Sequence, residues 1–208
     1  LSFAQSSGEE VVAVALGSKA KALAEQAGQY GAQTVYVCEN PELDQYNPEL
    51  YAHLLNATVE DFKPEVVLAS ATMTAKDLFP RVGARIGCGV ASDCTEIEIK
   101  NGELVIRKPL YAGKCTAQVN FQNSPVKIIL MRANQLPVGE AGEGKAAIIE
   151  LPFPELNLKT TVKEVIKGSS ERPDLTEANV IVSGGRGMKG PENFKVLEEL
   201  AGVLNATV

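Results

Sequence analysis

The stretch Val11-Val12-Ala13-Val14-Ala15-Leu16-Gly17 decides the fold of this chain. It is a short apolar run that ends at a glycine, and residues 19–30 after it carry apolar side chains at helical spacing until Gly31 stops the pattern. Apolar runs without alternation are typical of strands that are buried on both faces of a parallel sheet. The stretch therefore predicts a strand followed by a helix, which is the building unit of an open α/β sheet.

The same unit recurs twice along the first half of the chain. Strands are predicted at residues 34–38 and 66–70, and helices at residues 48–62 and 74–86. Repeated alternation of strand and helix favours an α/β fold with an open, mostly parallel, Rossmann-like sheet and right-handed crossovers.

The pattern changes after Gly89. Residues 95–99 alternate between polar and apolar side chains, Asn101-Gly102 is a strong hairpin signal, and residues 104–107 alternate back. Further strands are predicted at residues 116–121, 126–131 and 146–151. The simplest interpretation is an antiparallel extension attached to the parallel sheet.

A second domain is predicted to begin near residue 168. Residues 151–154 and the polar run at 167–173 are typical of an inter-domain connection. After them come a predicted strand at 179–183, a glycine loop, a helix at 191–204 with Pro191 in its first position, and the start of another strand. We therefore expect an N-terminal α/β domain at 1–167 and the incomplete beginning of a second α/β domain at 168–208.

Composition excludes several classes of function. The chain has 208 residues, a formal charge of −6 and a sequence pI near 5.0, which argues against a nucleic-acid binder. No apolar run approaches the length of a membrane span, and the first residues lack the features of a signal peptide. The cysteines show no C-x-x-C spacing and His53 is the single histidine, so we expect no metal site and reduced thiols of a cytosolic type; the cysteines are Cys38, Cys88, Cys94 and Cys115.

The strongest local motif is the glycine loop Gly185-Arg186-Gly187-Met188-Lys189-Gly190, which matches G-x-G-x-x-G between a predicted strand and a predicted helix. Glycines let a backbone approach phosphate, a helix start offers free N–H groups, and Arg186 adds a guanidinium for phosphate or flavin. We therefore identify Gly185, Arg186 and Gly187 as candidate cofactor-binding residues. The alternative is a tight turn whose glycines serve only close packing.

A second loop, residues 71–77, also lies between a strand and a helix. Its hydroxyl groups and Lys76 could face an anion at the strand end. The favoured interpretation is a helix N-cap, with Thr74 as the cap and Asp77 as the acid of a capping box.

No catalytic residue is predicted. A histidine-based triad would have to use His53, to which no Ser or carboxylate pattern is tied, and no base accompanies Cys88 or Cys94. Asp93 and Glu96 are interpreted as turn and solvent-facing residues rather than an acid/base pair.

Longer stretches are more specific than any of these motifs. They are residues 69–72 with 76–85, residues 91–95, residues 107–115, residues 172–178, and residues 182–189 with Glu192-Asn193-Phe194 after them. In this order they resemble the alpha subunits of electron transfer flavoproteins, and the resemblance covers nearly the whole chain.

The resemblance implies a nucleotide-hydrolase-like first domain that supports a beta subunit, and a second domain that carries FAD. It implies an electron carrier, not an enzyme, that accepts electrons from flavin dehydrogenases, such as those of fatty acid β-oxidation, and passes them to a quinone oxidoreductase or similar acceptor. Arg186 matches the position that contacts the flavin. The implied location is the cytoplasm of a bacterium or the mitochondrial matrix of a eukaryote.

The sequence departs from the family pattern at a few positions. Gly190 and Pro191 stand where a small residue and a glycine are usual, and Ala75 replaces a common glycine. The family's first strand is expected before Leu1 and its later flavin motifs after Val208, so we expect this chain alone to bind FAD weakly or not at all. The alternative function is an adenine-nucleotide-binding regulatory module without a redox role, and a hydrolase using Cys88 or Cys94 is the weakest candidate.

Overall fold

The structure is a computed structural model that describes residues 1–100, 103–165, 175 and 178–208. It divides into two compact units, Leu1–Lys163 and Glu164–Val208. The predicted Asn101-Gly102 turn, the polar connection at 167–173 and the expected domain boundary after residue 167 lie outside the described residues.

The first parallel sheet contains the strand that opens the fold. It has the order β1-β2-β9, formed by β1 (Val12–Leu16), β2 (Thr34–Cys38) and β9 (Ala147–Glu150). Helix α2 (Ala20–Gln29) connects β1 to β2 and packs small residues, Ala20 and Ala24, against them. The predicted strand–helix–strand unit is confirmed.

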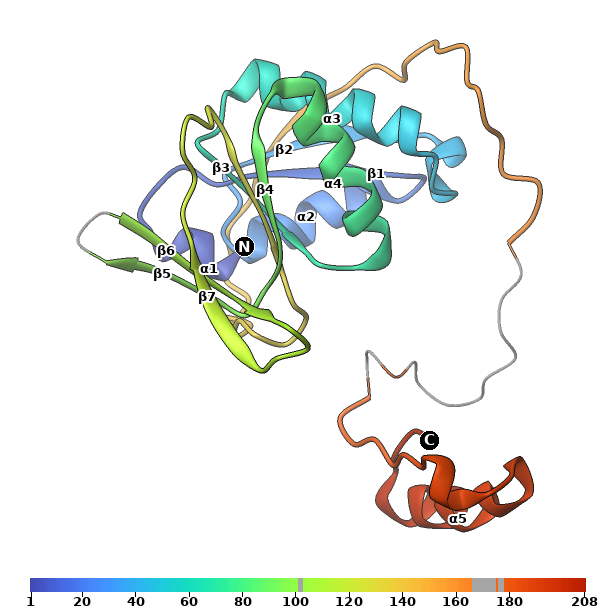
Figure 1. Ribbon diagram of the computed structural model, residues 1–208. Coiled ribbons are helices and arrows are strands. Elements are labelled where there is room, and N and C mark those ends of the chain that lie inside the picture. The colour runs from blue at the N-terminus through green and yellow to red at the C-terminus, as the bar shows by residue number, and fades with distance from the viewer. Residues whose placement is uncertain (101–102, 166–174, 176–177) are drawn as a thin grey trace. The chain divides into compact units, whose positions relative to one another are not determined.

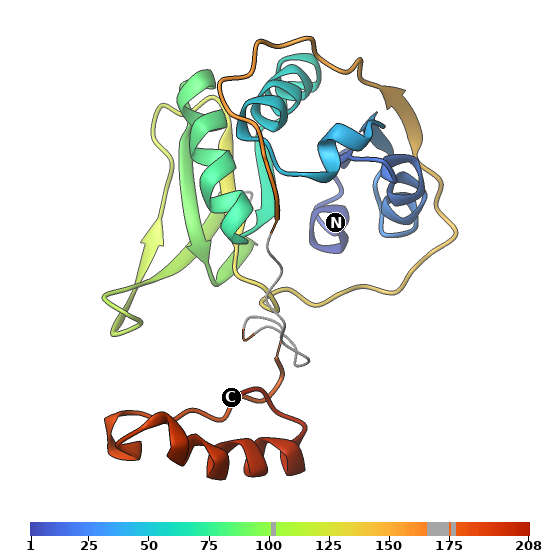
Figure 2. The same cartoon turned by 90° about the vertical axis from the view of Figure 1, so that its right-hand side faces the viewer.

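The second parallel sheet carries the carboxyl-end site described below. Its order is β3-β8-β4, formed by β3 (Val66–Ser70), β8 (Lys127–Met131) and β4 (Gly89–Cys94). Helix α3 (Pro48–Phe62) precedes β3, and helix α4 (Met73–Ile86) connects β3 to β4. Figure 2 shows α4 at the left, α3 at the top and α2 at the right of the view.

Helix α3 contributes side chains to the cores of both parallel sheets. Leu50 and Leu54 pack in one cluster with Cys38 of β2, whereas Ala52 packs in another cluster with Ile128 of β8. Asn47 begins the helix by accepting hydrogen bonds from the backbone N–H groups of the first turn. The helix is therefore the element that joins the two sheets into one unit.

Strands β1 and β3 each pair along one edge only within the described residues: β1 with β2, and β3 with β8. Both strands are mostly apolar, which is typical of central strands, yet their side chains are less buried than those of β2 and β8. Val66 of β3 is 39% exposed, whereas Ile128 to Leu130 of β8 are fully buried.

The third sheet is the predicted antiparallel extension. It has the order β5-β6-β7, with β5 (Glu96–Lys100), β6 (Glu103–Leu110) and β7 (Cys115–Val119), and it lies at the lower left of Figure 1. The register pairs Lys100 with Glu103, so the predicted β5–β6 hairpin is confirmed.

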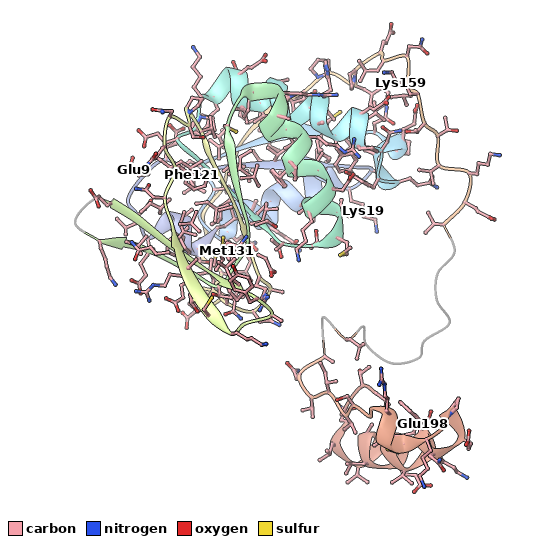
Figure 3. The ribbon with its side chains drawn as sticks, viewed as in Figure 1. Glu9, Lys19, Phe121, Met131, Lys159 and Glu198 are labelled. Atoms are coloured by element: carbon pink, nitrogen blue, oxygen red, sulfur yellow. The ribbon has the colours of Figure 1, made fainter. Side chains whose placement is uncertain are left out.

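A shared apolar cluster attaches this sheet to the parallel strands. Ile97 and Ile106 pair across β5 and β6 and pack with Cys94 of β4 and Met131 of β8. Phe121 is partly buried and packs against the same cluster, and both Phe121 and Met131 are labelled in Figure 3.

Two predicted strands belong to different sheets from those expected. The placement of residues 126–131 and 146–151 in the antiparallel extension is wrong, because β8 and β9 are parallel strands. Strand β8 is the central strand of its sheet, which explains its unbroken apolar run. Strand β4 was not predicted, because Gly89–Cys94 contains polar residues and a bulge between Ala91 and Cys94. The α/β class itself, with mostly parallel strands and an added antiparallel sheet, is confirmed.

The second unit contains one described α-helix and one isolated β-bridge. The bridge pairs Ile181 with Thr207 in parallel, so the predicted strand at 179–183 is reduced to a single pair. The predicted helix at 191–204 begins as a 3₁₀ turn, η3 (Pro191–Phe194), and continues as α5 (Lys195–Leu204). Three short helices complete the described elements: α1 (Ser2–Gln5), η1 (Pro41–Asp44) and η2 (Arg186–Met188). Among the described helices, none has the length and apolarity to cross a membrane.

Candidate functional site

The glycine loop of the second unit is a compact turn held by its own backbone. Residues Arg186–Met188 form η2, in which the Met188 N–H donates to the Gly185 carbonyl at 2.9 Å and the Lys189 N–H donates to the Arg186 carbonyl at 3.1 Å. The Asn193 side-chain amide donates to the Met188 carbonyl at 2.7 Å. These bonds fix the loop between the bridge at Ile181 and helix α5.

The glycines of the loop have different roles. A Cβ on Gly184 would lie 2.6 Å from Leu197 Cδ1 and 2.8 Å from Met188 Cγ, so this glycine packs closely against α5. A Cβ on Gly185 or Gly187 would meet nothing within 4 Å. The space on the Cβ side of these two positions is therefore open, and close packing inside this unit does not explain the two glycines.

Arg186 is exposed, and no described residue forms an ion pair or hydrogen bond with its guanidinium. Exposure and free N–H donors leave it able to bind an anion or an electron-rich ring. The three predicted cofactor-binding residues, Gly185, Arg186 and Gly187, thus lie on one open turn. This arrangement fits a bound nucleotide.

The loop does not lead directly into an α-helix. Four residues of η3 separate Gly190 from the start of α5 at Lys195. The free N–H groups of the α5 first turn are therefore not adjacent to the glycines, unlike in the G-x-G-x-x-G arrangement. Gly184, which the sequence motif leaves out, is the glycine that contacts the helix.

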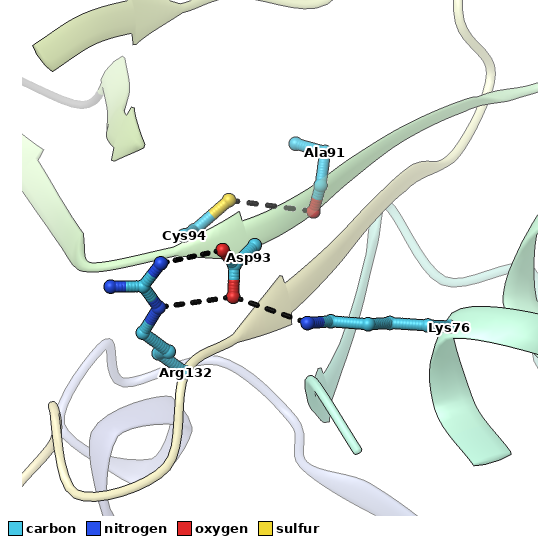
Figure 4. A network of polar contacts seen from close by, with 5 residues as sticks. All are labelled: Lys76, Ala91, Asp93, Cys94 and Arg132. Atoms are coloured by element: carbon cyan, nitrogen blue, oxygen red, sulfur yellow. Dashed lines mark hydrogen bonds and ion pairs between the residues drawn. The ribbon is translucent and has the colours of Figure 1, made fainter. Parts of the chain in front are cut away.

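A second group of charged side chains lies at the carboxyl ends of the β3-β8-β4 sheet. Asp93, near the end of β4, accepts hydrogen bonds from Arg132 through both oxygens: Nε lies 3.1 Å from Oδ1 and Nη2 lies 2.7 Å from Oδ2. Lys76, in the first turn of α4, lies 3.4 Å from Oδ1. Figure 4 shows both cations directed at the one carboxylate. Hydrogen bonding by Arg132 holds the pKa of Asp93 below its usual range.

The bulge in β4 places this carboxylate. Asp93 has a φ of 65°, and the pairing of β4 with β8 shifts between Ala91 and Cys94. The Arg132 N–H donates to the Cys94 carbonyl at 2.8 Å, which ties the end of β8 to the end of β4. Asp93 therefore lies in a strand bulge and its partly exposed carboxylate is paired, so the interpretation of it as a turn residue is wrong, whereas Glu96 is solvent-exposed as expected. The sequence analysis did not identify Arg132 as a site residue. Its position directly after an apolar strand could have indicated that it lies at the carboxyl end of the sheet.

The predicted cap of helix α4 is also corrected. Thr72 is the N-cap, and its hydroxyl accepts a hydrogen bond from the Ala75 N–H at 3.1 Å, so Thr74 is not the cap. Asp77 pairs instead with Arg81 one turn later and accepts a hydrogen bond from the Tyr46 hydroxyl at 2.7 Å. The sequence favoured Thr74 because Asp77 stands three residues after it, but the helix begins one residue after Thr72, so Thr72 provides the cap.

The remaining candidate catalytic residues, two cysteines and one histidine, have no features of an activated nucleophile or base. Burial raises the pKa of the Cys88 and Cys94 thiols, which is the reverse of what a nucleophile needs. His53 lies exposed on α3. In the described part of the chain, no group of His, Cys, Asp and Glu side chains could hold a metal ion. The raised pKa values of the Cys88 and Cys94 thiols weigh against the hydrolase candidate.

Comparison with known proteins covers both units. The electron transfer flavoprotein domain matches residues 1–156, and the electron transfer flavoprotein FAD-binding domain matches residues 174–208. The chain is 37% identical, over its full length and 66% of the relative, to the electron transfer flavoprotein subunit alpha of Syntrophomonas wolfei. It is 33% identical to the same subunit of Bacillus subtilis, over 96% of this chain and 61% of the relative.

A third relative has a different name. The chain is 32% identical, over 97% of its length and 49% of the relative, to subunit LctC of the NAD⁺- and ferredoxin-dependent lactate dehydrogenase of Acetobacterium woodii. The chain thus spans between about half and two thirds of the length of these relatives. The family match extends over most of the first unit and continues into the second, and the chain belongs to the electron transfer flavoprotein family.

Proposed function

We propose that this chain is part of an electron transfer subunit that works as an alpha/beta heterodimer with FAD. Electrons arrive from flavin dehydrogenases, those of fatty acid β-oxidation among the candidates, and leave to a quinone oxidoreductase or similar acceptor. The protein transforms no substrate of its own. The observation that carries the proposal is the match of residues 174–208 to an FAD-binding domain, in which Arg186 is exposed on an open glycine turn and has no ion-pair partner among the described residues.

Within this proposal, residues 1–167 form the domain that contacts the beta subunit, and residues 168–208 begin the FAD-binding domain. Arg186 holds the flavin electrostatically, while Gly185 and Gly187 let the backbone come close to it. FAD supplies the redox chemistry when bound, and the protein supplies position and charge. Relatives from bacteria support a cytoplasmic location.

The visible spectrum of the full-length protein tests the proposal. The protein is co-purified with its beta subunit, and a two-band oxidised flavin spectrum, with FAD released on denaturation, is the expected result. A colourless complex that added FAD cannot colour would sink the electron-carrier function. The regulatory nucleotide module would then become the better explanation, and calorimetric titration of this chain with AMP and ATP would examine it.

A further inference from the structure

The carboxyl ends of parallel strands are the place where open α/β sheets bind charged ligands. In the β3-β8-β4 sheet this place holds Lys76, which follows β3 on α4, Arg132, which follows β8, and Asp93 of β4. Three separate segments thus bring two cations and one carboxylate to one point (Figure 4).

We propose that Asp93 occupies, with its own carboxylate, an oxyanion site formed by Lys76 and Arg132, and that removing this carboxylate opens the site to phosphate. Asp93 is then an internal anion that keeps nucleotides and free phosphate out of the first domain. This role is independent of FAD and of the glycine loop.

The geometry of Arg132 supports this assignment. Its Nε and Nη2 meet the two oxygens of Asp93 side by side, which is the two-pronged arrangement that guanidinium uses for both carboxylate and phosphate. Lys76 approaches Oδ1 from a different element, so the site offers donors from two directions. The same donors suit the oxygens of a phosphate group.

The charge balance also fits an oxyanion. Two cations face a single carboxylate, so the group has one positive charge more than Asp93 can neutralise. A phosphate dianion would neutralise both cations. The side chains are 31% to 49% exposed, so an ion from solvent can reach them once Asp93 is gone.

The backbone of Asp93 is shaped to aim its side chain into this position. A non-glycine residue with a φ of 65° is strained and persists only where its surroundings hold it. The bulge interrupts the regular alternation of β4 and turns the carboxylate towards Arg132.

Phosphate titration of the 208-residue chain tests the proposal. Asp93→Asn removes the charge and suits the positive φ, because asparagine tolerates the left-handed region. By calorimetry at low ionic strength, we expect Asp93→Asn to bind inorganic phosphate at least about tenfold more tightly than the parent chain, on the scale of one charge-assisted hydrogen bond. The same titration with AMP shows whether a phosphate attached to a nucleoside also fits.

Matched variants give the proposal its controls. Glu96→Gln removes one carboxylate from the ion pair with Arg107 and changes the net charge equally, so its phosphate affinity should equal that of the parent chain. Arg132→Met added to Asp93→Asn should abolish the gain. Equal phosphate affinity in Asp93→Asn and Glu96→Gln, or equally tight binding by the parent chain, would overturn the proposal.

A stability measurement covers the case in which Asp93→Asn folds poorly. Asp93→Gly also suits the positive φ, and sulfate should raise the melting temperature of either variant more than that of Glu96→Gln, because a bound oxyanion replaces the lost carboxylate. The same sulfate response in all three variants would overturn the proposal.

Discussion

Asp93 and Arg132 connect the ends of two adjacent parallel strands through both oxygens of a single carboxylate. The two residues are 39 positions apart in sequence, and the strands that bring them together, β4 and β8, are joined through the antiparallel sheet. The pair therefore adds a side-chain connection to the backbone pairing of β4 with β8.

This pair predicts a pH-dependent contribution to stability. The pKa of Asp93 is lowered in the folded protein, so the charged form stabilises the fold above the unfolded pKa of about 3.9, and this contribution disappears as pH falls through the lower folded pKa. Urea denaturation should show Asp93→Asn less stable than the parent chain by on the order of 1 kcal/mol at pH 7. The difference should shrink towards zero near pH 2, and an unchanged difference would contradict the prediction.

The corrected N-cap of α4 predicts unequal effects of two neighbouring threonines. Thr72→Ala removes the hydroxyl that accepts from the Ala75 N–H and should lower the free energy of unfolding by about 1 kcal/mol. Thr74→Ala lies inside the helix on the exposed side and should be neutral or stabilising by a few tenths. Equal losses in the two variants, measured by urea denaturation, would argue for Thr74 as a second capping group.

Two helical glycines should respond to alanine with opposite signs. A Cβ on Gly28 of α2 would lie 2.6 Å from the Ala146 backbone nitrogen, so Gly28→Ala should destabilise the first unit by roughly 1–3 kcal/mol despite better helix propensity. Gly202 of α5 has no atom within 4 Å of its would-be Cβ, so Gly202→Ala should stabilise that helix by about 0.5–1 kcal/mol. Hydrogen exchange of the α2 and α5 amides separates the two effects, and protection of α2 by Gly28→Ala would be the contrary result.

Arg186 should matter for the flavin rather than for the fold. In the full-length protein with its beta subunit, Arg186→Ala should weaken FAD binding by roughly 10- to 100-fold, the scale of a hydrogen bond to a charged group, or lower the flavin potential. Lys195→Ala, at the start of α5, removes the same charge outside the loop and should change neither property. Unchanged affinity and potential in Arg186→Ala would remove this residue from the flavin site.

Local elements of the first domain could be predicted because their signals are local. The strand at residues 34–38 and the helix at residues 48–62 have the predicted bounds, since apolar runs, Asn47 and Pro48 act within a few residues of one another. The hairpin of β5 and β6 could be predicted for the same reason. Propensity and turn chemistry suffice where the interacting residues are neighbours in sequence.

Pairing between distant segments could not be predicted. The apolar run of β8 indicates a strand, but nothing in Lys127–Met131 specifies that it lies between β3 and β4. The site at Asp93 depends on that pairing, because Arg132 reaches Asp93 only through the position of β8. The role of Gly184 could not be predicted either, since Leu197 meets it through the packing of α5 and Met188 meets it through the fold of the η2 turn.

The one-sided pairing of β1 and β3 bears on how this chain behaves at high concentration. Within the described residues, each strand leaves the backbone N–H and C=O groups of one edge without a strand partner, and neither Val12–Leu16 nor Val66–Ser70 contains a charged residue or a proline. Strand edges without charged residues or proline can pair with strands from other molecules. Self-association of the 208-residue chain should therefore proceed by intermolecular β-pairing at these two edges and should be slowed by a lysine placed at Val12 or Val66.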